Sequence, residues 1–402
     1  MPKEQPTRRA FLQTTAAAAL AGTTVHPAFA YSDLSSQREP SIYERKLGLR
    51  PVINGVGTVT VLGGSIMPPE VVQAMVEASR YFIPLPELQR KVGARIAELL
   101  RVPAAMVTDG AASAIAVATA ACMAEGDPEK VRRLPDATSL KNEVIQQKSH
   151  RSGYEAQMQN AGATVIQVET RRELEEAISD RTAMLFFLNK ADPHGEIKRE
   201  EWIRIGKERN IPTFNDAAAD VPPRKRLWDY VNEGFDLVAF SGGKGLLGPQ
   251  GSGLLLGRED LVQSGHYAIS PYGGVGRGMK VGKEEIMGLL AAVERYLTVD
   301  HDAERNLLQS RVDYIINALS GVSGLRASVH VPKIANEVPH AMLEWDEKAL
   351  SLTSRDVRER LSEGDPPIMV SSVGEGQIRI SVWMMNGNEH KVVADRLREV
   401  FA

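Results

Sequence analysis

The stretch that decides the fold is residues 240–253, FSGGKGLLGPQGSG, which sets Lys244 among closely spaced glycines. The apolar run 237–240 predicts a buried strand, so Lys244 would stand just past a strand end. Glycine lets the backbone turn sharply and lets a ligand approach it closely. A lysine amine that burial strips of water can lose its proton and attack an aldehyde. Taken alone, the stretch is equally typical of a surface-loop lysine.

Asp216 ends the strand-like run that precedes this one, residues 211–215. A carboxylate there can hold the protonated nitrogen of a pyridine ring, which makes pyridoxal phosphate an electron sink. Asp216 by itself is also typical of a turn or a helix cap. Because Asp216 and Lys244 follow consecutive predicted strands, the two together indicate a pyridoxal-phosphate site.

A candidate phosphate site lies at Gly110, Ala111 and Ala112, where an alanine-rich predicted helix, 111–123, begins. Free N–H groups at a helix N-terminus attract anions, and small side chains let a phosphate come close. An ordinary helix start has the same pattern, so the motif is weak on its own. Ser241 would add a hydroxyl group to the phosphate site.

His150 follows another strand-like run, residues 144–147. Its ring could stack on a cofactor ring at this strand end; a solvated loop histidine is the alternative. No metal site is expected, because the eight histidines show no H-E-x-x-H spacing and a single cysteine cannot build a Cys-based zinc site.

The rest of the chain predicts an α/β fold. Short β-rich runs alternate with helical patterns, which is typical of a mostly parallel sheet with both faces covered. The glycine-rich stretch 264–278 predicts a functional or interface loop. From about residue 331 the pattern changes to that of a small α+β unit. We divide the chain into an export signal (1–30), an N-terminal segment (31–70), a large cofactor domain (71–300), a linker helix (301–329) and a small C-terminal domain (330–402).

Residues 1–30 place Arg8 and Arg9 before a mild apolar run, 14–25, that ends near small residues at 28–30. Charged, apolar and small-residue regions in this order look like a twin-arginine export signal. We therefore expect a periplasmic or otherwise extracytoplasmic protein; a cytoplasmic protein whose tail contains Arg-Arg by chance is the alternative. The apolar run is too short to span a bilayer, so no stable membrane insertion is expected.

The composition excludes several classes of protein. With 402 residues, 43% hydrophobic and 25% charged, the chain is neither disordered, nor collagen-like, nor a disulfide-stapled miniprotein. Its formal net charge of -3 gives no electrostatic reason to expect a nucleic acid, so a small-molecule substrate is expected. The single cysteine, Cys122, leaves lysine as the covalent residue to test.

In chain order, the phosphate site, His150, the run 215–223 (NDAAADVPP) and the run 241–244 (SGGK) resemble fold-type-I pyridoxal-phosphate enzymes. More narrowly, they resemble the selenocysteine-synthase-like branch that includes D-glucosaminate-6-phosphate ammonia lyase. Two further runs support the resemblance, RPVINGVGT at 50–58 and GRGMKVGK at 276–283. It covers roughly residues 41–402. It implies an aspartate-aminotransferase-like large domain with a mixed, mostly parallel sheet, plus a small C-terminal α+β domain.

The resemblance also implies roles for residues. Lys244 would form a Schiff base with pyridoxal 5'-phosphate and later remove the α-proton of the substrate, while Asp216 would pair with the pyridine nitrogen. His150 would stack on the ring. Arg379, in the strand-like run 378–381, resembles the arginine that clamps a substrate carboxylate, although a surface ion pair is equally possible for it.

Arg277 is a further anion-binding candidate, acting across a dimer interface, because the resemblance implies a homodimer or a higher homo-oligomer. The expected reaction is α,β-elimination on an amino acid or amino sugar acid, with release of ammonia. A selenocysteine-synthase-like transferase, a racemase, an aminotransferase and a non-catalytic binding protein on the same fold remain alternatives. The reactions share their first step, so Lys244 and Asp216 do not distinguish among them.

Overall fold

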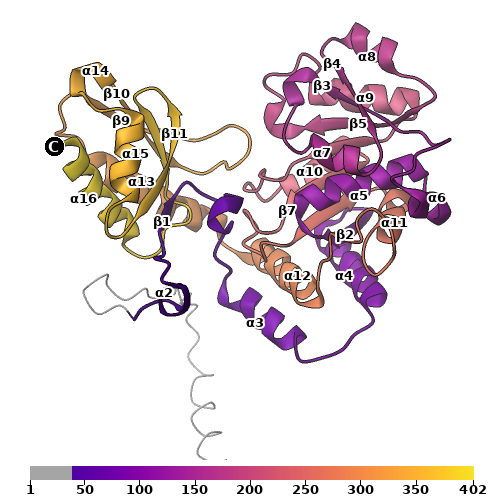
Figure 1. Ribbon diagram of the computed structural model, residues 1–402, viewed down its shortest axis with the longest axis horizontal. Coiled ribbons are helices and arrows are strands. Elements are labelled where there is room, and N and C mark those ends of the chain that lie inside the picture. Colours follow the sequence, from indigo (N-terminus) through magenta and orange to yellow (C-terminus); the bar gives the residue numbers. More distant parts are fainter. Residues whose placement is uncertain (1–38) are drawn as a thin grey trace, which may run out of the picture.

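A seven-stranded sheet forms the centre of the large domain in the computed structural model, which describes residues 39–402 (Figure 1). The predicted export signal therefore lies outside the described residues. The strand order is β2-β8-β7-β6-β5-β3-β4, and the neighbours from β7 to β4 run parallel. β8 is antiparallel to both β7 and β2, so the sheet is mixed and mostly parallel, as predicted. The strands are β2 (Ala104–Thr108), β3 (Glu143–Gln147), β4 (Thr164–Val168), β5 (Thr182–Leu188), β6 (Thr213–Asp216), β7 (Leu237–Ser241) and β8 (Gly253–Gly257).

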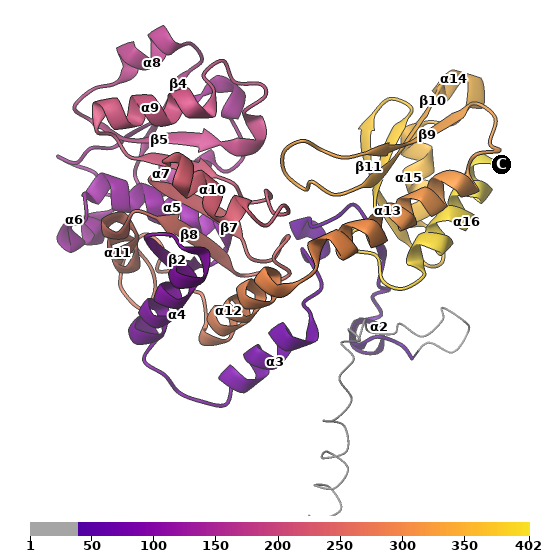
Figure 2. The same cartoon turned by 180° about the vertical axis from the view of Figure 1, so that it is seen from behind.

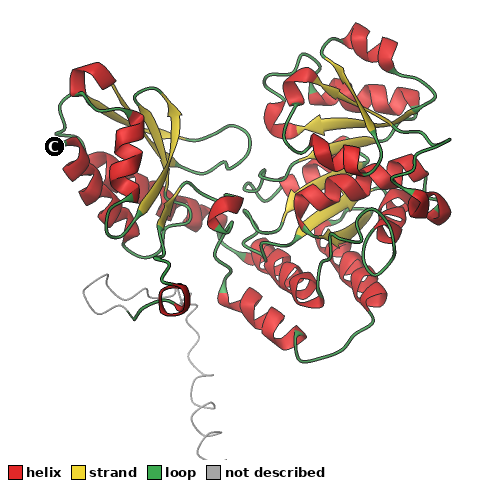
Figure 3. Ribbon diagram, viewed as in Figure 1, coloured by secondary structure: helices red, strands yellow, loops and turns green. Residues whose placement is uncertain are grey.

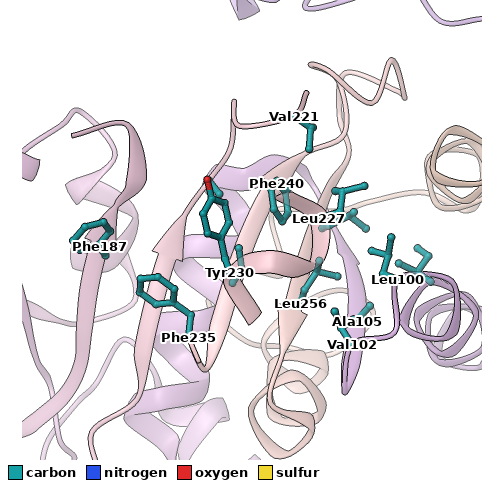
Figure 4. Close-up of a cluster of buried hydrophobic side chains, with 14 of the residues drawn as sticks. Leu100, Val102, Ala105, Phe187, Val221, Leu227, Tyr230, Phe235, Phe240 and Leu256 are labelled. Carbon is teal, nitrogen blue, oxygen red and sulfur yellow. The ribbon is translucent and has the colours of Figure 1, made fainter. Parts of the chain in front are cut away.

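Both faces of the central part of this sheet are buried, which explains why β5, β7 and β8 are rich in apolar residues. In β5, Leu185 and Phe187 belong to one core cluster and Met184 and Phe186 to the other, because successive side chains point to opposite faces. Figure 4 shows part of the first cluster, around Phe187 and Phe240.

Two sets of helices pack on the two faces of the sheet (Figure 3). The first set is α4 (Leu85–Leu100), α8 (Arg171–Ala177), α9 (Arg199–Arg209), α10 (Arg226–Glu233) and α12 (Lys283–Thr298). The second is α5 (Gly110–Ala124), α6 (Pro128–Arg133), α7 (Glu155–Asn160) and α11 (Glu259–Ala268). Among residues 39–402, no helix is both long enough and apolar enough to cross a membrane.

The small domain is built on a second, five-stranded sheet of order β1-β11-β12-β10-β9. Its strands are β1 (Ile53–Gly55), β9 (Leu325–His330), β10 (His340–Trp345), β11 (Ile368–Gly374) and β12 (Gln377–Ser381). Its helices are α13 (His301–Ala318), α14 (Glu347–Leu350), α15 (Ser354–Ser362) and α16 (Glu389–Phe401). β1 pairs in parallel with β11, and all other pairs are antiparallel. The sheet therefore takes one strand from the predicted N-terminal segment and another from the predicted linker, which differs from the boundaries drawn from sequence.

The N-terminal part of the described chain connects the two domains (Figures 1 and 2). After α2 (Ile42–Leu47) and β1, the chain passes through the short helix η1 (Thr60–Leu62) to α3 (Pro69–Ala78), which lies against α12. The Lys283 amine donates to the Ala78 carbonyl at 3.0 Å, and Arg295 donates to the Glu70 carboxylate at 3.0 Å.

One predicted loop is partly wrong. The stretch 264–278 was expected to be irregular because of its glycines, but its first residues, through Ala268, form the end of α11. Gly265 is tolerated there because it packs closely: a Cβ at this position would lie 2.8 Å from Val117 and 3.1 Å from Met106. The irregular part begins at Ile269 and continues to Gly282.

Candidate active site

A cavity of about 240 Å³ opens at the edge of the large sheet where the parallel strands end. It brings together six of the residues singled out from sequence: Gly110, Ala111, Ala112, Asp216, Ser241 and Lys244. Its lining does not include His150, Arg277 or Arg379. The roles of all these residues remain predictions, and the geometry below shows what each is placed to do.

The Lys244 side chain lies just past the end of β7, where tight backbone packing requires glycine. A Cβ at Gly242 would lie 2.1 Å from the Ser252 hydroxyl, and one at Gly245 would lie 2.0 Å from the Val221 carbonyl. Burial lowers the pKa of the Lys244 amine, and the negative charge of Asp216 partly opposes this shift. A larger share of the amine is therefore neutral than in a solvated lysine, and the neutral form is the nucleophile.

The Asp216 carboxylate is 5% exposed and stands at the end of β6, next to Leu188 of β5. Its Oδ1 accepts a hydrogen bond from the Ala218 N–H at 3.1 Å. Burial raises the pKa of Asp216, whereas this hydrogen bond and the charge of Lys244 act in the opposite direction. A cationic ring nitrogen beside Asp216 would supply the partner that a buried carboxylate requires.

The N-terminus of α5 forms the third wall of the cavity, and its groups fit a phosphate. Asp109, the N-cap residue, makes no side-chain cap hydrogen bond, so the first N–H groups of the helix remain available for a ligand. Gly110 has φ +80°, and a Cβ there would meet nothing within 4 Å, so the backbone borders open space. The Ser113 hydroxyl in the first turn is buried without a hydrogen-bond partner. These orphaned donors and the open space suit the phosphate of pyridoxal phosphate.

His150 ends the short helix η2 (Lys148–His150) and is fully buried. Its Nδ1 accepts a hydrogen bond from the Leu188 N–H at 3.1 Å, and its Nε2 lies 3.2 Å from Nε2 of Gln147. The ring meets Phe187 edge-on, with centroids 4.5 Å apart. Burial lowers the pKa of His150 to about 4, so the ring is neutral at neutral pH. The structure therefore places His150 in the core below the strand end and outside the cavity lining, and its stacking on a cofactor ring stays a prediction.

Tyr154, four residues further along, lines the cavity instead, with 47% of its surface exposed. Tyr154 was not predicted, because His150 is the first ring after the strand and the sequence does not show the turn made by η2. Thr58 and Thr60 were missed too, since they come from the N-terminal segment, and Gln250 was passed over within the glycine-rich stretch. The run 50–58, noted only as support for the resemblance, was the available signal for Thr58.

Arg379 lies on β12, between Ile378 and Ile380, whose side chains are buried in the small-domain core. Its own side chain points to the other face of that sheet, where its buried Nε has no hydrogen-bond partner. It forms no ion pair among residues 39–402, so the structure does not show the predicted surface ion pair. Its charge, after burial, helps to lower the pKa of His340 on β10 to about 4. Arg379 is thus a cation with free donors in the small domain, outside the cavity lining.

Arg277 is exposed in the irregular segment after α11 and does not line this cavity. Its N–H donates to the Gly274 carbonyl at 2.9 Å, and its side chain is free to reach a neighbouring molecule. Within one chain the structure therefore gives Arg277 no part in the site.

The fold and the site define a fold-type-I pyridoxal-phosphate enzyme, and comparisons with known proteins agree. The profile of the class-V aminotransferases matches residues 87–275. The chain is 31% identical over 369 residues to a 5'-C-glycyluridine monooxygenase-decarboxylase from a Streptomyces species, an alignment that covers 88% of this chain and 90% of the relative. The chain belongs to the class-V aminotransferase family.

Both the sequence and the structure of the chain are also similar to those of a D-glucosaminate-6-phosphate ammonia lyase. The chain is 28% identical over 374 residues to the D-glucosaminate-6-phosphate ammonia lyase of Salmonella typhimurium, covering 90% of this chain and 98% of the relative. A solved structure of a D-glucosaminate-6-phosphate ammonia-lyase superposes with a TM-score of 0.78 at 27% identity, covering 90% of this chain and 98% of the other. The predicted fold is therefore confirmed, and with the family come an enzyme and its cofactor, pyridoxal phosphate.

Proposed function

We propose that the protein is a pyridoxal-phosphate lyase that eliminates across the α,β bond of an amino acid or amino sugar acid and releases ammonia. The observation that carries this proposal is the meeting of Lys244, Asp216 and the uncapped N-terminus of α5 in one cavity. The similarity to an ammonia lyase along nearly the whole of that relative supports the reaction type. The proposal includes the narrower assignment of this chain to the selenocysteine-synthase-like branch, which contains that lyase.

The residues of the chain divide the work as follows. Pyridoxal phosphate, when bound, supplies an electron sink that lets the C–H bond at the α-carbon of the substrate break. The N-terminus of α5 and Ser241 would hold the phosphate, and Asp216 would keep the proton on the pyridine nitrogen. The Lys244 amine would be the group that attaches the cofactor to the chain and the base that accepts the α-proton of the substrate. Its lowered pKa favours this second task, because a neutral amine is the proton acceptor.

A leaving group on the β-carbon distinguishes elimination from the other reactions. For a 2-amino-3-hydroxy acid, loss of the α-proton and of the β-hydroxyl as water, followed by hydrolysis of the resulting imine, yields ammonia and a 2-keto acid. The water released in the first stage balances the water consumed in the second. A racemase would return the proton to the α-carbon, and an aminotransferase would keep the amine on the cofactor.

The test has two stages. First, the purified chain is incubated with pyridoxal phosphate, reduced with borohydride and digested; the reduced cofactor is expected on the peptide that contains Lys244. Protein that stayed colourless after this incubation would overturn the assignment. Second, amino acids and amino sugar acids are screened for ammonia plus keto acid. Inverted substrate without ammonia would indicate a racemase, and oxygen uptake with loss of carbon dioxide would indicate the activity named in the Streptomyces relative.

We also infer that the chain works as a homo-oligomer, with its contact surface in residues 61–83. Large apolar side chains are exposed there, including Val61 (88%), Ile66 (61%) and Phe82 (103%). Because Gly64 within this surface and Thr60 next to it line the cavity, a second copy seated on this surface would also shield the cavity from water. Light scattering is expected to give a multiple of the chain mass, and Phe82→Ser with Val61→Ser is expected to lower it. A monomeric wild-type protein would contradict the inference.

Export by a twin-arginine signal is a separate proposal, supported by the order of charged, apolar and small residues in 1–30. A reporter fused behind residues 1–38 is expected to reach the periplasm. Replacing Arg8→Lys and Arg9→Lys together is expected to keep the reporter in the cytoplasm, whereas an unchanged location would remove the proposal. An acidic, exported enzyme would also fit poorly with a cytosolic tRNA substrate, which disfavours the selenium-transferase alternative.

A further inference from the structure

A second buried carboxylate, Asp220, lies four residues after Asp216 in the turn that follows β6 and is only 3% exposed. Its Oδ2 accepts hydrogen bonds from the Tyr230 hydroxyl at 2.8 Å and from the Asn189 side-chain amide. Asn189 begins the short helix η3 (Asn189–Ala191) after β5, and Tyr230 lies on α10. Asp220 is therefore held from two different elements at the strand-end edge of the sheet.

The hydrogen bonds around Tyr230 have one consistent direction. Its hydroxyl accepts from Asn189 at 2.7 Å and from Arg226 at 2.7 Å, which leaves its own proton for Asp220. Burial raises the pKa of Tyr230 further above its ordinary value, so the hydroxyl stays protonated and remains a donor. Figure 4 shows the Tyr230 ring set in the apolar core, and the guanidinium of Arg199 lies 5.3 Å from the ring centre. The donor is thus fixed in place by its surroundings.

The turn that carries Asp216 and Asp220 is also bonded to the small domain. The Asn336 N–H donates to the Ala219 carbonyl of this turn at 2.8 Å. Arg226 of α10, which donates to Tyr230, lies 3.8 Å from the Glu337 carboxylate. Residues 331–339 form the loop between β9 and β10 that extends toward the large domain (Figure 1). The position of Asp220 is consequently set from three directions, which a solvated turn residue would not need.

The turn 216–220 lies beside Lys244: Asp216 and Ala218 line the same cavity as Lys244, and the Ser241 N–H donates to the Ala218 carbonyl at 3.2 Å. Charged groups at two strand ends are therefore placed to act on the Lys244 amine. Asp216 and Asp220, in and after β6, favour its charged form, and Lys190 of η3 disfavours it. Asp220 itself faces the charges of Asp216 and Arg226 besides its two hydrogen-bond donors. Burial raises the pKa of Asp220 to about 6, so the group is largely ionised at pH 7 to 8 and its charge is present there.

We propose that Asp220 is a positioning residue of the cofactor site: held by Tyr230 and Asn189, its carboxylate fixes the turn 216–220 and its charge, opposed by that of Lys190, acts on the Lys244 amine. This inference rests on the proposed function for its catalytic meaning. The effect of Asp220 and Lys190 on the pKa of the Lys244 amine depends on the chain alone, so it can be measured with and without the cofactor. Two oppositely charged residues predict two opposite shifts, which a purely structural role for either would not produce.

The test measures the pH dependence of Lys244 in the full chain by two readouts. One is the rate at which an amine-specific reagent labels Lys244 in cofactor-free protein, followed by mass spectrometry. The other is the visible absorbance of lysine-bound cofactor as a function of pH. Asp220→Asn removes one negative charge at nearly constant size, so the midpoint of each titration is expected to fall. Lys190→Gln is expected to move both midpoints upward.

Two further variants refine the test. Tyr230→Phe removes the donor to Asp220 and keeps the ring, so a smaller shift in the direction of Asp220→Asn is expected. Asp229→Asn makes the same chemical change on α10, one residue away from Tyr230 and outside the network, and no shift is expected. Unchanged midpoints in a folded Asp220→Asn protein would overturn the proposal. Should that variant fail to fold, Tyr230→Phe decides for Asp220, because it removes only the hydrogen bond donated to that carboxylate, and unchanged midpoints would overturn the proposal. A missing upward shift in Lys190→Gln would overturn the opposing effect of Lys190, which is exposed.

Failure of this inference is distinguishable from failure of the proposed function. If the wild-type chain binds pyridoxal phosphate at Lys244 but the variants do not shift the midpoints, the function stands and the role of Asp220 falls. If no cofactor attaches to Lys244, the proposed function falls, and the labelling of the cofactor-free amine still reports whether Asp220 and Lys190 act on it.

Discussion

The two domains present their candidate binding residues in different ways. On the large-domain side, Asp216 ends β6, Ser241 ends β7, and α5 starts soon after β2. Parallel strands bring their carboxyl ends to one edge, so residues far apart in the chain meet there through topology alone. On the small-domain side, Arg379 lies on a separate sheet, and its distance from the cavity depends on how the two domains are set against each other.

This difference separates cofactor chemistry from substrate recognition. The residues that fit the cofactor belong to one sheet and the helix packed on it, so their mutual positions do not depend on how the two domains are set. The free donors of Arg379 belong to the other sheet. We therefore expect variants on the large-domain side to affect the reaction itself, and variants on the small-domain side to affect mainly the binding of the substrate.

The largest effect is expected for Lys244→Ala. Without the amine there is neither a covalent bond to the cofactor nor an acceptor for the α-proton, so kcat should fall by roughly 10⁴-fold or more. Borohydride reduction should leave no cofactor attached to the chain. Lys225→Ala removes an exposed lysine near α10 and is the matched control; retained covalent cofactor in Lys244→Ala would show that another lysine does this work.

Asp216→Asn should have the next largest effect. The amide has nearly the same shape but no charge to hold a proton on the pyridine nitrogen, so kcat is expected to fall about 10²- to 10³-fold. Because Lys244 is untouched, the cofactor should still attach, and reduction should still trap it. A variant with kcat within a few-fold of wild type would show that the electron sink does not depend on this carboxylate.

Arg379→Gln tests the other side of the comparison. Losing a charge-assisted hydrogen bond to a carboxylate costs about 1.5–3 kcal/mol, so KM should rise roughly 10- to 100-fold, with a smaller change in kcat. Arg277→Gln is the informative partner variant. If only that variant raises KM, the substrate carboxylate is held by the exposed loop of a second chain, and the carboxylate clamp lies outside the small domain.

The same comparison explains what could be read from the sequence. The strand ends, Lys244, Asp216 and the start of α5 were predictable because a buried parallel strand is apolar throughout and its end fixes where the next residue stands. The strand β1 was not predicted, because it is only three residues long and is a strand through its pairing with the distant β11. Sequence patterns carry no record of such pairing.

The finding that Tyr154 lines the cavity and His150 does not has a similar physical reason. Both rings follow β3 within a few residues, and residue type does not decide between them. The short helix η2 turns the chain so that His150 points into the core against Phe187, while Tyr154 reaches the cavity. A one-turn change in a loop decides which ring faces a ligand, and local propensity does not determine such a turn.

A smaller effect is expected for Tyr154→Ala. If the exposed ring packs on the cofactor, its loss should weaken cofactor binding by about 0.5–1.5 kcal/mol, or roughly 2- to 12-fold in Kd. Tyr154→Phe keeps the ring and should bind as the wild type does. Titration of the cofactor-free protein with pyridoxal phosphate, followed by fluorescence, gives the Kd values. Equal values for Tyr154→Ala and wild type would show that the Tyr154 ring does not pack on the cofactor.

The smallest effect on catalysis and the clearest effect on stability are expected for His150→Gln. The folded ring has a pKa of about 4, whereas in the unfolded chain it takes up its proton at roughly pH 6.5. Between these values the unfolded state binds more protons than the folded state, so the free energy of unfolding falls as the pH falls from about 6.5 to 4. The contribution of His150 amounts to roughly 3 kcal/mol at the acidic end.

Removing the ring removes this part of the pH dependence. Urea unfolding of His150→Gln should therefore give a shallower decline between pH 6.5 and 4 than the wild type, although His266 and His340, with pKa values also lowered to about 4, keep the slope from vanishing. If instead His150→Gln left the pH dependence intact and abolished the visible absorbance of bound cofactor, the His150 ring would contact the cofactor. Its position in the core, away from the cavity, would then be wrong.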